Sequence, residues 1–333
     1  MAIILGIESS CDETSASICI NGKVINNEIA TQAIHEQYGG VVPELASREH
    51  QRNIVPIVSN VIESAGVKMS DIDAIAYTRG PGLLGALLIG SSFAKSTALA
   101  LSVPTIPIHH MKAHVLAHFI DDPKPVYPFI CLTVSGGHTQ ILRVNSATEM
   151  IILGQTQDDA VGEAFDKAAK LLGLPYPGGP LIDKLSKEGD PRAFKFTKSE
   201  MPNLDYSFSG IKTSILYFLR KELQKNEKFI ENNLKDLAAS IQATLVDMLM
   251  QKLRLAVKQE GITSVAIAGG VSANSGLRTA LEEESTKSNW KIFIPDFQYC
   301  TDNAGMIAIS GHLLYEQNAF GDLKDSPLPR MPF

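Results

Sequence analysis

The chain has 333 residues, of which 44% are hydrophobic and 20% are charged, an ordinary composition for a globular enzyme. This length is enough for about two domains, each with its own core. The net charge of −6 argues against a protein that coats nucleic acid unaided, because neutralising phosphates needs a clustered basic surface. The apolar run at the amino terminus is too short for a signal peptide, and no stretch approaches the roughly 18 apolar residues of a membrane helix. We therefore expect a cytoplasmic protein with no membrane attachment.

Two further features of the composition bear on function. The most basic neighbourhood runs from Lys184 to Lys212, and contact with nucleic acid or a solvated surface explains it equally well. The cysteines lack C-x-x-C spacing, so we expect free thiols in a reducing compartment. These cysteines are Cys11, Cys19, Cys131 and Cys300.

The first half of the chain predicts a hairpin, then a buried strand that enters a glycine turn and a helix. The elements are strands at residues 3–7 and 16–20 around a polar bend at 9–14, a strand at 74–78, a turn at 79–82 and a helix at 83–101.

The second half of the chain predicts the same series of elements. They are strands at residues 129–134 and 139–144 around a bend at 135–138, a strand at 264–268, a turn at 269–274 and a helix at 275–284. A strand, a glycine turn and a helix amino terminus together form an anion site, because unpaired amide groups point outward there. The alternative is a tight connection without a ligand. Because the pattern is duplicated, we favour two α/β halves with a nucleotide in the cleft between them.

Two segments predict structure without chemistry. Residues 228–260 carry apolar side chains at helical spacing, which predicts an amphipathic helix that faces the core. Residues 322–333 contain three prolines and predict an irregular strap on the surface.

Four of the eight histidines fall within residues 109–118. On a helix, His110 and His114 lie four residues apart on one face, close enough to share one metal ion. His118 is about 12 Å further along the axis from His110, too far for the same ion. Solvated or hydrogen-bonded histidines are the alternative. The pattern is not that of a zinc protease, because no carboxylate stands between the two histidines.

Several aspartates and glutamates are candidates for the remaining chemistry. Asp302 precedes a helical pattern at residues 306–315, and it is either the N-cap of that helix or a third metal ligand. Asp166 is either an exposed partner of Lys170 or an acceptor of ribose hydroxyl groups. Asp12 and Glu13 occupy the first bend, where turn formation explains Asp12 and where either residue could act as a general base.

Two other kinds of site are not supported. Ser135 lies near His138, but no G-x-S-x-G motif exposes a serine nucleophile. No Walker-type loop is present either. The turn at Gly179 lets the backbone approach a ligand and precedes Asp183, for which packing is the alternative role.

Nine motifs occur in order along nearly the whole chain. They lie at residues 6–14, 39–48, 80–83, 110–114, 134–140, 162–167, 206–210, 269–274 and 300–303. Taken together they resemble the bacterial tRNA adenosine threonylcarbamoyltransferases, the TsaD family, once labelled glycoproteases. Lys112 and Ala113 depart from the pattern, because relatives usually carry Glu-Gly there; the histidines themselves are intact.

The resemblance implies an α/β protein with the actin-like, sugar-kinase-like (ASKHA) fold. Two ribonuclease-H-like lobes with a cleft between them are then expected, an amino-terminal lobe of residues 1–108 plus 303–333 and a carboxyl-terminal lobe of residues 109–302 with helical insertions. The implied reaction moves the threonylcarbamoyl group from threonylcarbamoyl-AMP to the N6 amine of the adenosine 3′ of the anticodon, in tRNAs that read codons beginning with A.

The resemblance also implies roles for matching residues. His110, His114 and Asp302 would hold one divalent metal, Fe2+ or, as the alternative, Zn2+. Asp12 or Glu13 would act as the base. The adenylate site would be lined by Thr133, Val134, Ser135, Gly136, Gly137, Asp166, Gly179, Asp183 and Asn274.

The implied partners are tRNA, threonylcarbamoyl-AMP, a smaller paralogous TsaB-like subunit and a TsaE-like P-loop ATPase. Three other functions remain open at this point. They are an ATP-dependent kinase or ATPase of the same fold, a metallopeptidase, and a scaffold without enzymatic activity.

Overall fold

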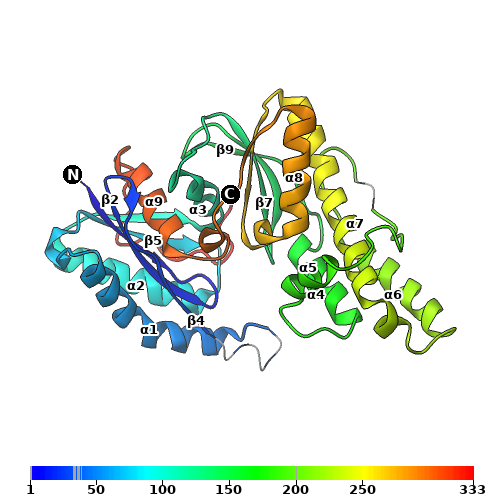
Figure 1. The fold of residues 1–333 in the computed structure, drawn as a ribbon. Coiled ribbons are helices and arrows are strands. Elements are labelled where there is room, and N and C mark those ends of the chain that lie inside the picture. Colours follow the sequence, from blue (N-terminus) through cyan, green and yellow to red (C-terminus); the bar gives the residue numbers. More distant parts are fainter. Residues whose placement is uncertain (1, 33–34, 36–37, 39, 200) are drawn as a thin grey trace. The chain divides into compact units, whose positions relative to one another are not determined.

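A computed structural model describes residues 2–32, 35, 38, 40–199 and 201–333 (Figure 1). Gly39, which belongs to one of the nine motifs, lies outside the described residues. The chain divides into two compact units. Unit 1 contains residues 1–125, 146–149 and 295–333, and unit 2 contains residues 126–145 and 150–294.

These units differ from the expected lobes at both boundaries, since residues 109–125 and 295–302 belong to unit 1. The reason is packing. Ala113, Ala117 and Tyr299 share one buried cluster with Met306 and Ile307. The segment after the last strand of unit 1 therefore completes the core of that unit.

Unit 1 is built on a six-stranded sheet with the order β3-β2-β1-β5-β6, and β4 pairs with β2. Strands β1, β5 and β6 are mutually parallel, whereas β2 runs antiparallel to β1. The strands are β1 (Ile3–Glu8), β2 (Glu13–Ile20), β3 (Lys23–Val24), β4 (Glu28–Thr31), β5 (Ala74–Gly80) and β6 (Thr105–His109). The α-helices are α1 (Pro43–Ser64), α2 (Leu84–Leu101), α3 (His110–Leu116) and α9 (Ala304–Tyr315).

Unit 2 is built on a five-stranded sheet with the order β11-β10-β7-β8-β9. Its strands are β7 (Phe129–Val134), β8 (Thr139–Val144), β9 (Met150–Gln155), β10 (Ser264–Ala268) and β11 (Lys291–Phe293). Its α-helices are α4 (Val161–Leu171), α5 (Gly178–Ser186), α6 (Ser209–Leu223), α7 (Phe229–Glu260) and α8 (Ser275–Ser288). In unit 1 the antiparallel strands β1, β2 and β3 pair through β1 with the parallel strands β5 and β6. In unit 2 the antiparallel strands β7, β8 and β9 pair through β7 with the parallel strands β10 and β11. The duplication predicted from the sequence is therefore confirmed.

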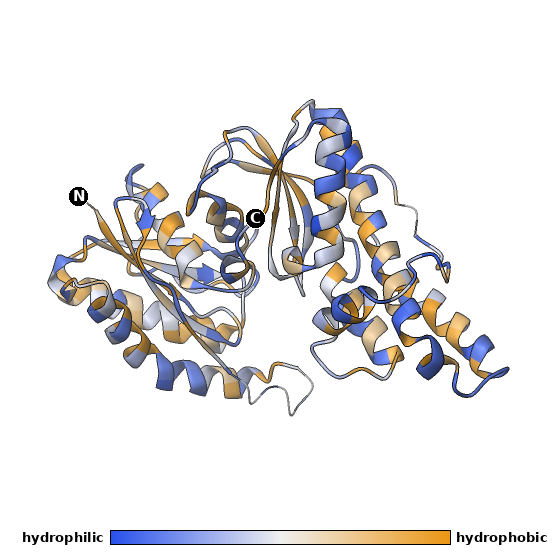
Figure 2. Cartoon of the chain, in the orientation of Figure 1, coloured by the Kyte–Doolittle hydropathy of each residue, from blue (hydrophilic) through white to orange (hydrophobic). Residues whose placement is uncertain are grey.

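Alternation along β1 shows how the core of unit 1 forms. Leu5 and Ile7 lie in a buried cluster with side chains of α1 and α2, whereas Ile4 lies in a second cluster with side chains of α9. Helices therefore cover both faces of this strand, which explains its continuous apolar sequence. Figure 2 shows the strands of both sheets as mostly hydrophobic, whereas α1 has one hydrophilic side. Gly6 allows the closest approach, since a Cβ there would lie 2.6 Å from the amide nitrogen of Ala308.

Helix α2 corrects one expectation from the sequence. Over 18 residues its mean hydropathy is 1.4, so by length and composition it is apolar enough to cross a membrane. The expectation from the sequence that no stretch is long and apolar enough for a membrane helix is therefore wrong. In the structure, 33% of this window is buried, and Ala94 and Ala98 pack in the core between the sheet and α1. A core helix that covers a sheet can be as long and as apolar as a membrane helix.

Most predicted elements are confirmed within a few residues. Helix α9 begins at Ala304, two residues earlier than expected, and α7 contains a kink at Asn233. Residues 322–333 form no helix or strand, as predicted for a strap. They hydrogen-bond to the end of β5, from the Leu328 amide to the Arg79 carbonyl, and accept a hydrogen bond from Lys95 of α2 at the Asp325 carbonyl.

Candidate functional site

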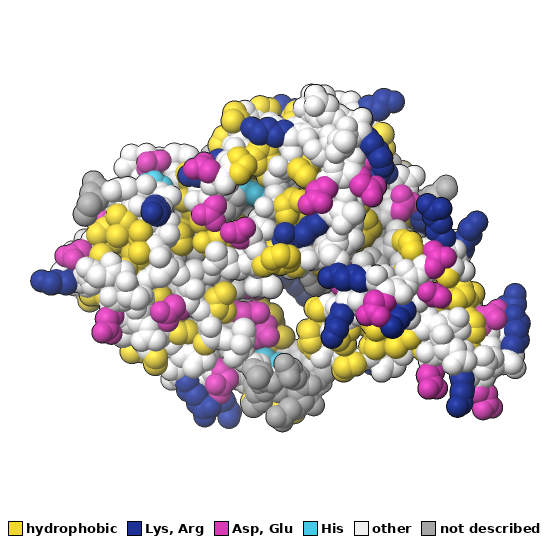
Figure 3. Space-filling model, viewed as in Figure 1, with side chains coloured by type: hydrophobic (Ala, Val, Ile, Leu, Met, Phe, Trp, Pro, Cys, Tyr) yellow, Lys and Arg dark blue, Asp and Glu magenta, His cyan; other side chains and the backbone are white. Residues whose placement is uncertain are grey.

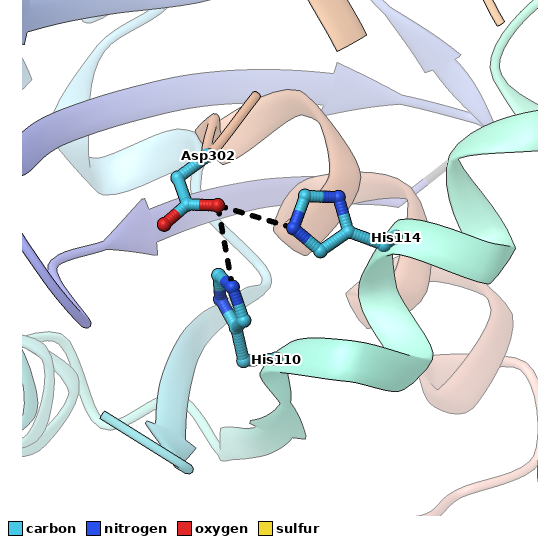
Figure 4. Close-up of side chains that lie close together, drawn as sticks. All are labelled: His110, His114 and Asp302. Carbon is cyan, nitrogen blue, oxygen red and sulfur yellow. Dashed lines mark hydrogen bonds and ion pairs between the residues drawn. The ribbon is translucent and has the colours of Figure 1, made fainter. Parts of the chain in front are cut away.

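The three candidate metal ligands all belong to unit 1. Strand β6 ends at His109 and continues directly into α3, which places His110 and His114 in the first two turns of that helix. Asp302 lies just before α9. Figure 4 shows the three side chains pointing toward one another. The predicted convergence of a distant carboxylate on two imidazoles is thus present.

The spacing of these ligand atoms suits a small divalent cation. Oδ1 of Asp302 lies 3.3 Å from Nε2 of His110 and 3.1 Å from Nε2 of His114, and one ligand atom from each residue falls within 4.8 Å of the others. Metal–ligand bonds of about 2.1 Å at angles between 90° and 109° separate neighbouring ligand atoms by about 3.0–3.4 Å. Two imidazoles and one carboxylate also leave coordination positions open for a substrate oxygen. The residues present therefore fit a metal ion.

Glu8 orients the first of the two imidazoles. Its side chain is completely buried at the end of β1, and Oε2 lies 3.0 Å from Nδ1 of His110. The same carboxylate accepts hydrogen bonds from the Thr78 hydroxyl and the Ser10 amide. With its proton on Nδ1, His110 presents the lone pair of Nε2 to a metal, an arrangement common around metal-bound histidines. Nδ1 of His114 is buried and has no hydrogen-bond partner among the described residues.

The residues after Asp302 fix its backbone. Ser15 accepts a hydrogen bond from the Ala304 amide at 2.8 Å, and Asn27 accepts one from the Gly305 amide at 3.0 Å. The N-cap of α9 is Asn303, whose side chain accepts a hydrogen bond from the Met306 amide. The alternative N-cap role of Asp302 is therefore wrong. Since its neighbour caps the helix, the carboxylate of Asp302 is free to face the histidines.

Charge coupling around the three ligands is strong. Burial lowers the pKa of His110, but the carboxylates of Asp302 and Glu8 outweigh burial and hold this pKa well above 6.5. Conversely, burial raises the pKa of Asp302, but His110 and His114 hold it well below its usual range. One positive charge at the centre of the group is therefore stabilised, whether a proton or a metal cation supplies it.

Asp12 and Glu13 lie in the bend of the first hairpin, also in unit 1. Burial raises the pKa of Glu13 to about 9, and the nearby carboxylates of Asp302 and Asp12 add to this shift. His50 of α1 fixes the bend, because its ring nitrogens lie 2.7 Å from the Thr14 hydroxyl and 2.9 Å from the Cys11 carbonyl. The bend is thus held near Asp302, as a role close to the metal requires.

The candidate phosphate loop lies in unit 2, between β7 and β8. Gly136 and Gly137 are exposed, with open space on the side where a Cβ would lie. The Ser135 amide, however, donates to the His138 carbonyl at 2.8 Å, so this amide is not free to bind a phosphate. The hydrogen bond that closes the turn uses the Ser135 amide. The Gly136 amide is therefore the donor of this loop most available to a phosphate. Thr133 and Val134 are buried in β7.

Asp166 lies on α4 and binds the start of α5. Its Oδ1 accepts hydrogen bonds from the amides of Gly178 and Gly179 at 2.8 and 3.1 Å. The alternative ion pair with Lys170 does not form among the described residues, because the carboxylate turns toward these amides instead. Its second oxygen, Oδ2, is left without a partner in the part of the chain that the structure describes. Two predicted residues, Asp166 and Gly179, are thereby brought together.

Asp183 and Asn274 also lie side by side. Oδ1 of Asp183 accepts from both the amide and the hydroxyl of Ser275. The Asn274 side chain accepts from the Leu277 amide as the cap of α8 and donates to Gln242 at 2.7 Å. Both side chains therefore hold the amino terminus of α8 in place. A cavity of about 480 Å³ lies beside them, lined by Ser275 and other residues of α5, α7 and α8.

The residues that support the metal ligands of unit 1 were not predicted from the sequence. Glu8, Ser15 and Asn27 carry no spacing signal, because each acts through a contact with a residue distant in the chain. Only Glu8 could have been suspected, since it is the single charged residue at the end of an otherwise apolar strand. The histidine pair and Asp302 were found because spacing and motif mark them.

Two units with the same strand order, one of them carrying a candidate metal triad, define a protein of the actin-like, sugar-kinase-like fold. Solved structures confirm this class. HypF in its phosphate- and nucleotide-bound form has a TM-score of 0.64 at 15% identity, covering 96% of this chain and 47% of that one. The ROK hexokinase from Thermus thermophilus has a TM-score of 0.51 at 14% identity, covering 95% of this chain and 99% of that one.

Sequence similarity identifies the family. Residues 23–309 match the family model described as tRNA N6-adenosine threonylcarbamoyltransferase. Relatives of this name from Christiangramia forsetii and Cytophaga hutchinsonii are each 56% identical, covering 99% and 98% of this chain and 98% and 96% of the relatives. The chain belongs to the tRNA N6-adenosine threonylcarbamoyltransferase family, as the motifs predicted, and is a transferase that modifies tRNA.

Proposed function

We propose that the donor is threonylcarbamoyl-AMP and the acceptor is the N6 amine of the adenosine 3′ of the anticodon, in tRNAs that read codons beginning with A. The amine nitrogen forms a bond to the carbamoyl carbon, and the bond from that carbon to the phosphate oxygen breaks. AMP leaves, and a base takes the proton of the amine. The observation that carries this proposal is the convergence of His110, His114 and Asp302 at 3.1 and 3.3 Å.

His110, His114 and Asp302 would hold the metal, which we propose to be Fe2+, with Zn2+ as the alternative. This donor set is one that both non-haem iron and catalytic zinc use in other proteins. When bound, the metal supplies Lewis-acid polarisation of the carbamoyl carbonyl. Asp12 or Glu13 would take the proton of the attacking amine. Glu13 could do so only with its carboxyl ionised, because burial raises the pKa of Glu13 to about 9.

Unit 2 would bind the adenylate. The backbone at Gly136 and Gly137 would hold the phosphate, because exposed amides stabilise the charge that collects on the leaving group. Oδ2 of Asp166 would accept a ribose hydroxyl, since Oδ1 is already engaged. Asp183 and Asn274 would act by holding α8 beside the cavity of about 480 Å³, which would take the base.

We also propose the partners and location that the family resemblance implies. These are a smaller paralogous TsaB-like subunit, a TsaE-like P-loop ATPase and the cytoplasm, without attachment to a membrane. Three exposed apolar side chains of unit 1 support contact with a subunit: Val55 of α1 and Leu84 and Leu88 of α2 are 57%, 52% and 44% exposed.

The decisive experiment incubates the chain with its partner proteins, threonylcarbamoyl-AMP and unmodified tRNA, and then analyses the nucleosides. We expect His110→Ala and Asp302→Ala each to lower transfer by at least about a hundred-fold while the fold is kept, because the metal is lost.

His312→Ala is the matched control, because His312 is also a buried histidine of unit 1 but lies outside the triad. It should lower stability without abolishing transfer. Transfer near the wild-type rate in a folded His110→Ala or Asp302→Ala variant would contradict the proposal. Transfer of phosphate from ATP to an acceptor, or cleavage of peptides, would instead favour the kinase or the peptidase.

A further inference from the structure

Helix α6 has a buried side and a basic outer side. Ile211, Ile215 and Leu219 are buried in the core of unit 2. The rest of the helix surface exposes Ser209 and five further residues, and we call these five the α6 face. The α6 face consists of Lys212, Thr213, Tyr217, Arg220 and Lys221.

The cations of the α6 face are not used within the fold. Lys212, Arg220 and Lys221 have no ion pair or hydrogen bond to another side chain in the part of the chain that the structure describes. The nearest acid in the sequence, Glu222, pairs with Lys225 at 2.7 Å. The chain as a whole has a net charge of −6, whereas the exposed half of α6 carries three unpaired cations, with Lys212 on one flank and Lys221 on the other.

Helix stability does not explain all of these cations. Arg220 and Lys221 lie in the last turn, where positive charge is favourable for the helix dipole. Lys212, however, lies in the first turn of α6, where the dipole opposes a cation. Its exposure and position therefore point to a partner outside the unit.

A neighbouring loop extends the basic surface. The Thr197 amide donates to the Ser214 hydroxyl at 2.9 Å, which holds this loop against α6. The same loop exposes Lys195, whereas its Lys198 is paired with Asp247. Figure 3 shows Lys and Arg side chains, with acidic ones among them, over the part of unit 2 that carries α4, α5 and α6.

Asp158, an acid beside the start of α6, is ionised and its oxygens are occupied by hydrogen bonds. Its two oxygens accept from the amides of Phe208 and Ser209 and from the hydroxyls of Ser207 and Ser209. These bonds also hold the pKa of Asp158 below its usual range, although burial opposes the shift. This carboxylate therefore binds the start of α6 and, among the described residues, forms no ion pair with a cation of the α6 face.

Tyr217 lies among these cations and is 63% exposed. Surfaces that combine positive charge with an exposed aromatic ring suit single-stranded or looped nucleic acid, because the cations contact phosphates and the ring stacks on a base. Lys212 and Arg220 are eight residues apart, about 12 Å along the helix, so they would contact different phosphates.

We propose that the α6 face, together with Lys195, docks the tRNA substrate. Lys212, Arg220 and Lys221 contact phosphates, and Tyr217 stacks on an unpaired base. This inference rests on the function of the family, in which tRNA is the acceptor, and it assigns a surface for recognition that is built from a helical insertion rather than from the candidate catalytic groups.

The test measures binding of an unmodified tRNA transcript to the whole chain by fluorescence anisotropy at several salt concentrations, with no donor present. Lys212→Gln and Arg220→Gln should each weaken binding several-fold and reduce the slope of log K against log salt by about 0.7–0.9. Tyr217→Ala should weaken binding by about five-fold or more and leave the slope unchanged, and Tyr217→Phe should restore binding.

Lys258→Gln is the matched control, because Lys258 is an exposed lysine on α7 of the same unit. Circular dichroism and unchanged binding of the adenylate check that each variant is folded. The proposal is overturned if the α6 variants bind tRNA as the control does, or if the wild-type chain does not bind tRNA. Loss of a protein partner with normal tRNA binding would assign the surface to that partner instead.

Failure of this inference is distinguishable from failure of the proposed function. Binding is measured without transfer, and transfer is measured separately by nucleoside analysis of the wild-type chain. A chain that binds tRNA through the α6 face but transfers nothing contradicts only the proposed reaction. A chain that transfers normally when the α6 face is altered contradicts only the docking surface.

Discussion

Glu8 is completely buried at the end of β1, and its carboxylate holds Nδ1 of His110 at 3.0 Å. We predict that Glu8→Gln lowers metal affinity by about ten- to a hundred-fold, because partners of metal-bound histidines contribute this much elsewhere. Competition with a chelator of known affinity measures the effect. Glu284→Gln is a suitable control, since Glu284 is a buried, paired glutamate of unit 2. Equal affinities in the wild-type chain and Glu8→Gln would show that Glu8 does not orient the ligand.

Metal affinity should also depend on pH. Asp302 and Glu8 raise the pKa of His110 well above 6.5 against the opposing effect of burial, so a metal must displace a proton over the range above 6.5. We predict that affinity rises with pH from 6.5 upward, by about ten-fold per unit for one displaced proton. Over the same range the metal-free protein should lose the stability that the raised pKa of His110 provides. Metal titrations in a pH series check this, and a flat profile would contradict it.

Helix α9 is the element that brings Asp302 to the histidines, and its contact with β1 is very close. A Cβ at Gly6 would lie 2.6 Å from the Ala308 amide nitrogen and 2.8 Å from the Ala304 carbonyl oxygen. Both atoms are backbone, so α9 must shift as a whole. We predict that Gly6→Ala destabilises the protein by about 1–3 kcal/mol and weakens metal binding, because Asp302 moves with α9.

Denaturant unfolding and metal titration of Gly6→Ala test this prediction together. Asn303→Ala is the comparison, because loss of this N-cap should cost about 1 kcal/mol without adding volume between α9 and β1. If Gly6→Ala binds metal as the wild-type chain does, the position of α9 does not control the ligand geometry.

At the scale of elements, much could be predicted from local sequence. Strand β1, strand β7 and helix α8 follow from apolar periodicity and glycine turns. Helices α1 and α6 were not predicted as elements. The apolar residues Ile211, Ile215 and Leu219 nevertheless have helical spacing, and they form the buried side of α6 in the core of unit 2.

For the whole molecule, the two groups of candidate residues fall in different units. The three metal ligands belong to unit 1, whereas the candidate adenylate residues belong to unit 2. We predict that a divalent metal at 100 times its dissociation constant stabilises unit 1 by about 2.7 kcal/mol, because it binds only the folded state. Hydrogen exchange should then slow in β1, α3 and the start of α9 but not in α4 and α5.

Asp302→Ala serves as the control in the same exchange experiment, and it should remove the protection. Protection that appears equally in both units, or in neither, would contradict a metal site confined to unit 1. Addition of the adenylate should give the reverse pattern, with protection around the loop at Gly136 and the start of α5.

The sequence by itself determined the duplicated α/β plan, the histidine pair and the family, because periodicity, spacing and ordered motifs are local properties of the chain. Only the tertiary structure decided that Asp302 faces the histidines while Asn303 caps α9, since the two residues are adjacent and both are N-cap types. It also decided that Glu8 orients His110 and that the Ser135 amide is engaged. The physical reason is that hydrogen-bond partners distant in sequence carry no periodic signal, so their choice appears only when the strands and helices pack.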